Sequence, residues 1–375
     1  MNGPTPNPAR DAQPIDQIEL LAPLELPTGG WDQLVGPDDV FLDTGWQAVV
    51  HRTADAWLGY LLATRDGFPH AGLAMALATT EVPWPMGRPD LILAEAVEGS
   101  QPGAARAAEL LGCPAGAHAA AQLLPSLALG GRHLGHTRAV GATTDLASID
   151  ALLKRAEAQA DALGARSVAV PFLDETDVAL ATALTNRGYV HFDVDEYSTL
   201  DIPEGGLDAY LASLPAPRRR EALRERRRLT EAGLTVQLHT LDQVDHQRLA
   251  QLEVNLLAKY GTIWPQANAL RWLETIQNTV GAHARVLVGE AQDEVRSFAL
   301  IYCHHDRWAV RQAGFDYKWQ QQTHTALYFE TIFYAMVEAA SAANVTRIHY
   351  GLASGKAKKS RGCTSSIQRC WIKQC

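Results

Sequence analysis

The sequence predicts an α/β fold with mixed sheets, built as two units in tandem with a basic helical arm between them. Apolar, strand-like runs alternate with amphipathic helical segments over residues 16–202, and the pattern returns from residue 234 onward. Between the two series, residues 203–233 are rich in arginine. A chain of 375 residues, 47% of them hydrophobic, is long enough for about two domains with buried cores.

The charge is unevenly distributed. The chain carries a net charge of −9, which argues against a generic nucleic-acid-binding protein. Two segments are nevertheless strongly basic: Arg218–Arg228 holds seven arginines and two glutamates, and Ala339–Cys375 holds seven lysines and arginines and no acidic residue. A locally basic surface on an acidic protein steers anions to one place.

No targeting or membrane-spanning segment is expected. Residues 1–14 lack the apolar core of a signal peptide and are expected to be a disordered N-terminus. No run approaches the roughly 18 apolar residues that a membrane span needs. The five cysteines are odd in number and lack CxxC spacing, so we expect a reduced, cytoplasmic protein without a metal site.

The first series predicts strands and helices in alternation. Asp66-Gly67 is a good turn dipeptide for a hairpin, and Val82–Pro89, with three prolines, is expected to be a loop. The expected strands are Asp16–Ala22, Ala56–Thr64, Ala71–Thr79, Asp90–Ala96, Leu134–Gly141, Ser167–Leu173 and Tyr189–Ile202. The expected helices are Phe41–Arg52, Gly103–Leu111, Ala115–Leu123, Leu146–Gly164 and Thr176–Arg187.

The arm is expected to be helical and to end at Gly233. Arg220, Arg224 and Arg227 or Arg228 fall on one face at i, i+4 and i+7/8 spacing. One interpretation is a solvated helix whose glutamates pair with neighbouring arginines. The other is a contact surface for phosphates, from a substrate or from RNA.

The second series has the order β-α-α-β-β-β-α-β and is followed by a basic stretch, Gly351–Gly362. The expected strands are Leu234–His239, Ala284–Gly289, Val295–His304, Trp308–Gly314 and Thr346–Tyr350. The expected helices are Asp242–Tyr260, Asn268–Gly281 and a long one, Thr323–Ala343.

This order resembles the GNAT acyltransferase fold, and the chain as a whole resembles the double-GNAT enzymes of the Fem type. Those are the aminoacyl-tRNA-dependent transferases of peptidoglycan bridges, with relatives in antibiotic biosynthesis. The likeness is strongest over residues 210–362. The residues that carry it are Leu223–Gly233, Glu253 with Asn255, Lys259-Tyr260-Gly261, Gly314-Phe315-Asp316-Tyr317, and Gly351 with Lys358 and Gly362.

The resemblance implies a division into two GNAT-like domains, residues 15–202 and residues 234–375, the second being catalytic and ending in a basic tail. Residues 203–233 would be the arm between them. It also implies amide formation by direct attack of an amine on an activated acyl group. We expect the strand ending at Gly314 and the strand Thr346–Tyr350 to part near their ends, which would leave backbone N–H groups to polarise the acyl carbonyl.

The donor is open between two candidates. In GNAT enzymes that use acetyl-CoA, a glycine-rich turn opens the long helix, and its backbone N–H groups close on the pyrophosphate. The corresponding stretch here, Gln320–Ala326, holds neither glycine, and it is either an anion site or a plain helix N-cap. This favours aminoacyl-tRNA as the donor, with no cofactor, and leaves acyl-CoA as the alternative. A third possibility is an inactive module that only binds RNA or a carrier protein.

The candidate catalytic residues are Glu253 and Asp316 as bases or amine anchors, and Tyr260 and Tyr350 as proton donors to the leaving oxygen. Each also has a plainer interpretation: a solvated helix face for Glu253, a turn carboxylate for Asp316, and core packing for the tyrosines. The candidate substrate- and donor-binding residues are Arg220, Arg224, Arg227, Asn255, Arg311, Thr323, Thr325, Lys358 and Arg361. The expected partners are aminoacyl-tRNA and a small polar molecule with an amine, and no membrane.

Overall fold

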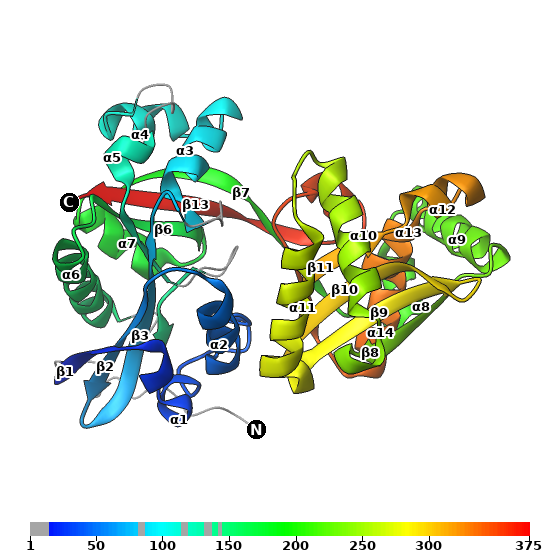
Figure 1. Cartoon of the computed structure of the whole chain (residues 1–375), viewed down its shortest axis with the longest axis horizontal. Coiled ribbons are helices and arrows are strands. Elements are labelled where there is room, and N and C mark those ends of the chain that lie inside the picture. Colours follow the sequence, from blue (N-terminus) through cyan, green and yellow to red (C-terminus); the bar gives the residue numbers. More distant parts are fainter. Residues whose placement is uncertain (1–14, 82–86, 114–118, 131–136, 142–144) are drawn as a thin grey trace. The chain divides into compact units, whose positions relative to one another are not determined.

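The computed structural model describes residues 15–81, 87–113, 119–130, 137–141 and 145–375. The chain divides into two compact units, Met1–Glu196 with Ser366–Cys375, and Tyr197–Ser365 (Figure 1). The expected division put everything after residue 234 in the second unit, whereas the last ten residues lie in unit 1. The helical arm lies in unit 2. The expected disordered N-terminus, most of the loop Val82–Pro89 and the first part of the strand Leu134–Gly141 lie outside the described residues.

Unit 1 is an α/β unit whose sheet has the order β1-β2-β3-β4-β6-β13, with β5 pairing to β3. The strands are β1 (Gln17–Leu21), β2 (Leu58–Arg65), β3 (Phe68–Ala78), β4 (Ser126–Leu129), β5 (Val140–Gly141), β6 (Ser167–Asp174) and part of β13 (Thr364–Gln374). The helices are α1 (Thr28–Trp31), α2 (Thr44–Thr53), α3 (Pro89–Glu98), α4 (Ala104–Leu110), α5 (Ala119–Leu123), α6 (Leu146–Ala162) and α7 (Val178–Asn186).

Two predictions in unit 1 show opposite outcomes. The β2–β3 hairpin is confirmed: Asp66 and Gly67 form its two-residue turn with φ of 53° and 75°, the left-handed conformation that this turn requires. The strand expected at Asp90–Ala96 is wrong, because the segment is helix α3. Pro89 occupies its first turn, Arg88 holds Asp90 in a bidentate ion pair, and the apolar side chains face the core at helical spacing.

The mixed sheet of unit 2 has the strand order β7-β12-β11-β10-β9-β8. Its strands are β8 (Thr235–Thr240), β9 (Ala284–Ala291), β10 (Glu294–His304), β11 (Arg307–Phe315), β12 (Arg347–Gly351) and the end of β7 (Val190–Asp201). Its helices are α8 (Gly206–Ser213), α9 (Ala216–Glu231), α10 (His246–Lys259), α11 (Gln266–Val280), α12 (Tyr317–Thr323), α13 (Leu327–Phe329), α14 (Ala335–Ala342) and α15 (Gly355–Lys359).

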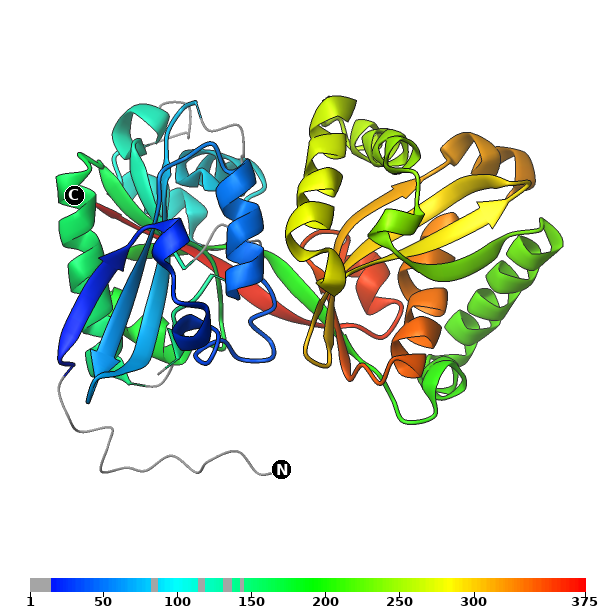
Figure 2. The same cartoon turned by 60° about the horizontal axis from the view of Figure 1, so that its bottom comes forward.

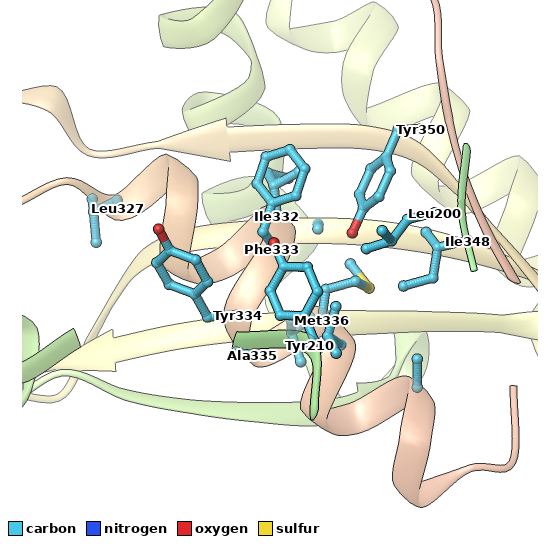
Figure 3. Close-up of a cluster of buried hydrophobic side chains, with 14 of the residues drawn as sticks. Leu200, Tyr210, Leu327, Ile332, Phe333, Tyr334, Ala335, Met336, Ile348 and Tyr350 are labelled. Atoms are coloured by element: carbon cyan, nitrogen blue, oxygen red, sulfur yellow. The ribbon is translucent and has the colours of Figure 1, made fainter. Parts of the chain in front are cut away.

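Helices cover both faces of this sheet (Figure 2). On one face α10 packs against β11 and α11. On the other, α8, α9 and α14 contribute to a large apolar core that includes Leu229. Phe333 and Ile348 also belong to this core (Figure 3). The mixed sheet with helical layers on both sides confirms the predicted fold class.

The long helix expected over Thr323–Ala343 is confirmed from Leu327 to Ala342, but its expected start at Thr323 is wrong. Helix α12 ends at Thr323, His324 takes the left-handed conformation with φ of 52°, and α13 begins only at Leu327. A π turn, Glu330–Tyr334, then joins α13 to α14 without a break in the helix. Thr323 therefore ends a helix instead of opening one.

The stretch after β12 is ordered, not an extended tail. Helix α15 follows β12, and β13 then runs from unit 2 into unit 1, where it pairs antiparallel with β6 from Gln368 opposite Asp174 to Gln374 opposite Ser167. Strand β7 takes the chain from unit 1 into unit 2. No helix of the described residues is long and apolar enough to cross a membrane.

Candidate functional site

Strands β11 and β12 separate after a short parallel ladder. Arg307, Trp308 and Ala309 pair with Arg347, Ile348 and His349. Strand β11 then continues to Phe315 and β12 to Gly351, and the described residues of the two strands form no further ladder pairs. The predicted parting of these two strands is confirmed. Backbone N–H groups at such a splay are available for an acyl carbonyl.

A β-bulge lies in β11 just where the splay begins. Strand β10 pairs Leu300 with Gln312 and Ile301 with Val310, so Arg311 is the extra residue. Arg311 and Gln312 both contact the helices of one face: the Arg311 guanidinium lies 5.2 Å from the Trp272 ring of α11, and Gln312 contacts α10. The bulge therefore brings two consecutive polar side chains to the same layer.

Glu253 of α10 faces this bulge. It is 9% exposed, and both carboxylate oxygens accept from Gln312 Nε2 at 2.9 Å. Burial raises the pKa of the Glu253 carboxyl, and the contacts with Gln312 and Arg311 only partly oppose this. A carboxyl whose pKa is raised toward neutrality suits a general base.

Glycine at position 314 lets α10 approach the strand this closely. A Cβ at Gly314 would lie 2.4 Å from the Leu252 carbonyl carbon and 2.6 Å from the Glu253 nitrogen. Helix backbone and strand backbone are thus in direct contact. The position of Glu253 beside Gln312 depends on this contact.

Asp316 directly follows β11, and its hydrogen-bond and ion-pair partners stabilise the local structure. It caps α12 by accepting from the Trp319 N–H at 3.0 Å, and it pairs with Arg248 at 3.1 Å and Arg296 at 2.9 Å. Burial alone would raise the pKa of the Asp316 carboxyl, but the Trp319 N–H and the two guanidiniums lower it. A carboxylate with a lowered pKa is a weak base.

The two candidate tyrosines lie in different surroundings. Tyr260 ends α10 and is 66% exposed. Tyr350 is buried, packs its ring 4.9 Å from the ring of Phe333, and points its hydroxyl into the apolar core (Figure 3). That hydroxyl has no hydrogen-bond partner among the described residues, and burial raises its pKa well above the ordinary value. Among the described residues, neither tyrosine hydroxyl is hydrogen-bonded to Glu253.

Helix α9 has two faces. Arg220, Arg224 and Arg227 are exposed, whereas Ala222 and Leu229 are buried in the core of unit 2. Arg227 pairs with Glu231 at 3.5 Å, an exposed pair of little energetic weight. Both interpretations of the exposed arginines, a solvated face or a phosphate contact, fit this geometry. Asn255 of α10 is also exposed.

The structure corrects the expectation for Lys358 and Arg361, because both are buried. Lys358 donates to the carbonyl oxygens of Tyr350, Gly351 and Leu352 at 2.6–2.9 Å. The Arg361 guanidinium lies 3.8 Å from the Phe329 ring and donates to the Tyr334 hydroxyl at 2.8 Å. It also pairs with Glu225 at 3.3 Å. Both cations hold the segment after β12 in place and are not displayed to a polyanion.

Thr323 and Thr325 are likewise engaged with the protein. The Thr323 hydroxyl donates to the Trp319 carbonyl at 2.9 Å, and the two threonine hydroxyls are 2.9 Å apart. Of the candidate residues, the structure thus brings together Glu253 and Arg311. Sequence reasoning missed Gln312 and Trp272, although a glutamine directly after Arg311 inside a strand was a visible signal.

Comparisons with known proteins relate this chain to a protein family. The model of the FemAB-like family, described as peptidoglycan biosynthesis/recognition, matches residues 128–372. A crystal structure of FemX is similar over 94% of this chain and 96% of its own, with 12% identity and a TM-score of 0.61.

Two further solved structures share the fold. A conserved protein of unknown function from Bacteroides thetaiotaomicron is similar over 95% of this chain and 99% of its own, with 11% identity and a TM-score of 0.55. The C-terminal domain of a putative lysylphosphatidylglycerol synthetase from Agrobacterium fabrum covers 92% and 91%, with 12% identity and a TM-score of 0.52. No protein of curated function matches the sequence.

Proposed function

Because the chain belongs to the FemAB-like family and shares its fold with FemX, we propose that it is an acyltransferase of the tandem GNAT type and, more narrowly, an aminoacyltransferase. The reaction moves an aminoacyl group from an aminoacyl-tRNA to an amine of a small polar acceptor. The acceptor is a cell-wall precursor or a natural product, which agrees with the family's description as peptidoglycan biosynthesis/recognition. A reaction that draws on aminoacyl-tRNA takes place in the cytoplasm.

The observation that carries the proposal is the splay of β11 and β12 with Glu253 and Gln312 beside it. The acceptor nitrogen attacks the ester carbonyl of the donor, so a C–N bond forms and the C–O bond to the ribose breaks. Glu253 takes the proton that the neutral amine loses and returns it to the ribose oxygen, which leaves as a hydroxyl group. Backbone N–H groups at the splay stabilise the negative charge that develops on the carbonyl oxygen.

The choice of donor rests on what lies between β11 and the following helix. The segment 316–326 holds helix α12 and no glycine, and the carboxylate of Asp316 is fixed at its start. A pyrophosphate needs close backbone N–H groups and no neighbouring anion. The exposed arginines of α9, by contrast, suit a long phosphate backbone, because phosphate contacts supply much of the affinity for RNA.

The test is product formation from candidate amines incubated with tRNA, synthetases, ATP and amino acids, followed by mass spectrometry. We expect an acceptor enlarged by one amino-acid residue, and no product after RNase treatment of the donor mixture. The Glu253→Gln variant, matched to the wild type in size and fold, is expected to lose most of the rate. Product that survives RNase, or that forms from acyl-CoA alone, would reject the tRNA donor.

A further inference from the structure

A pocket lies in unit 2, apart from the splay. It has a volume of about 530 Å³ and lies between α9, the start of β8, and the π turn with α14. None of the residues that line it belongs to α10, β11 or β12. Its apolar wall is formed by Leu223, Leu229, Leu234, Val236 and Ala335.

The charged residues of this pocket are arranged around one buried carboxylate, Glu330. Glu330 is 5% exposed, and its Oε1 accepts from Arg226 Nε at 3.1 Å. Arg226 also donates to Glu338 at 2.8 Å. The second oxygen of Glu330, Oε2, has no hydrogen-bond partner among the described residues.

Neither protonation state of Glu330 is fully satisfied by the protein. Burial raises the pKa of this carboxyl, Arg226 lowers it, and Glu338 and Glu225 raise it further. The ionised carboxylate leaves a buried acceptor unused, and the protonated acid leaves a buried O–H unused. A buried polar group without a partner is unfavourable, so a ligand that supplies the partner gains binding free energy.

The backbone at Glu330 is also unusual. Glu330 opens the π turn, in which the Ala335 N–H donates to the Glu330 carbonyl. Single π turns inside helices are rare and occur frequently at functional sites. Phe329 and Phe333 of the same segment pack in an aromatic cluster, while Glu330 lies against α9.

We propose that this pocket binds a small molecule with a primary ammonium group and an apolar body. The ammonium pairs with the carboxylate of Glu330, which lines the pocket, and the body lies against the leucines of α9 and the side chains at the start of β8. The volume falls in the range of small-molecule pockets, about 300–1,000 Å³. The proposal does not depend on the transfer reaction, because the pocket shares no residue with the splay.

The probe is benzylamine, compared with benzyl alcohol, which has the same ring without the charge. Calorimetric titration at pH 8 is expected to give binding of benzylamine in the millimolar range and at least tenfold weaker binding of benzyl alcohol. Glu330→Gln is expected to weaken benzylamine at least tenfold. Glu253→Gln is the matched control and is expected to leave it unchanged.

A second variant covers the case in which Glu330→Gln folds poorly. Thr235 is exposed and lines the pocket from β8, so Thr235→Phe fills the space without altering a charge. It is expected to abolish benzylamine binding while the melting temperature stays within a few degrees. Equal binding of both probes, binding undiminished by Thr235→Phe, or binding lost in Glu253→Gln would each overturn the proposal.

Discussion

Glu253 shows how stability and chemistry oppose each other at a single residue. Its carboxyl is buried on α10 and receives hydrogen bonds from one side chain, Gln312. The folded protein therefore holds the proton more tightly than the unfolded chain does, because the pKa is raised by burial. Such a group stabilises the fold below the unfolded pKa of about 4.3, and this stabilisation is lost as the pH rises through the folded pKa.

The first prediction follows from the direction in which the pKa of Glu253 is shifted. Glu253→Gln removes the ionisable group, so its free energy of unfolding is expected to exceed that of the wild type increasingly as the pH rises from 5 to 8. The difference should approach about 1.4 kcal/mol for each unit by which the folded pKa is raised. The transfer rate of the variant is expected to fall about 10²–10⁴-fold. Urea denaturation at several pH values and single-turnover rates measure the two quantities, and a variant that is less stable at pH 8 would contradict the assignment.

Gly314 supports the same carboxylate through the backbone. Gly314→Ala puts a Cβ into the backbone of α10, so we expect a loss of about 1–3 kcal/mol of stability and a reduced transfer rate from a displaced Glu253. Gly29→Ala is the control, because nothing lies within 4 Å of the added Cβ. Thermal denaturation of both variants tests this, and equal stabilities would contradict the close contact of α10 with β11.

At the residue scale, the sequence indicated which residues could have a role, but it did not show which groups lie opposite each side chain. This limited the predictions of individual roles. Glu253 and Arg311 could be proposed because a family resemblance and a charge inside a strand draw attention to them. Lys358 was expected to bind an anion, but the basic run around it gives no sign that three carbonyl groups surround its ammonium. Gln312 was missed because its role exists only through the bulge at Arg311.

Helix α9 has an exposed basic face and a face buried in the core of unit 2. The arginines Arg220, Arg224 and Arg227 are exposed and lie outside the core. The buried Arg361, by contrast, pairs with Glu225 on the other side of α9. Replacing a charge on the first face should change association with a polyanion. Removing the buried cation should change stability, because a buried charge is left without its partner.

The third prediction contrasts these faces. The triple change of Arg220, Arg224 and Arg227 to Gln is expected to keep the melting temperature within about 2 °C and to lower the salt dependence of tRNA binding by roughly two units of log K per log salt. Arg361→Gln is expected to lose about 3–5 kcal/mol of stability. Filter binding at several salt concentrations and urea denaturation distinguish the two. An unchanged salt dependence in the triple variant would favour the interpretation of α9 as a solvated helix.

At the scale of helices and strands, local sequence signals predicted some elements and missed others. Asp66-Gly67 predicted the β2–β3 hairpin because the turn needs residues that tolerate positive φ. The break between α12 and α13 was missed because His324 adopts positive φ without being glycine, and the side chain of Gln320 satisfies the N–H of Leu327 at 3.2 Å. Tertiary contacts of this kind leave no trace in a local pattern.

For the whole molecule, the course of β13 was the least predictable feature. Residues Ser366–Cys375 are separated from unit 1 by the whole of unit 2, yet they pair with β6. Their apolar run Cys370–Ile372 was visible, but no local rule selects a partner strand nearly two hundred residues away in the sequence. The pairing also explains two of the cysteines: Cys370 is fully buried in the strand, and Cys375 is exposed at its end.

The last prediction concerns this return of the chain. Deleting Ser366–Cys375 uncovers the edge of β6 and removes the buried side chains of Cys370, Trp371 and Ile372. At about 1.5–3 kcal/mol for each large apolar side chain, the loss approaches the whole stability of a typical domain. Hydrogen exchange followed by mass spectrometry is therefore expected to show lost protection in β6 and α7 and retained protection in β9 and β10. A peptide of residues 366–375 is expected to restore it, and Cys375→Ser, which changes only the exposed end, should not disturb it. Full protection of β6 in the truncated chain would mean that unit 1 folds without β13.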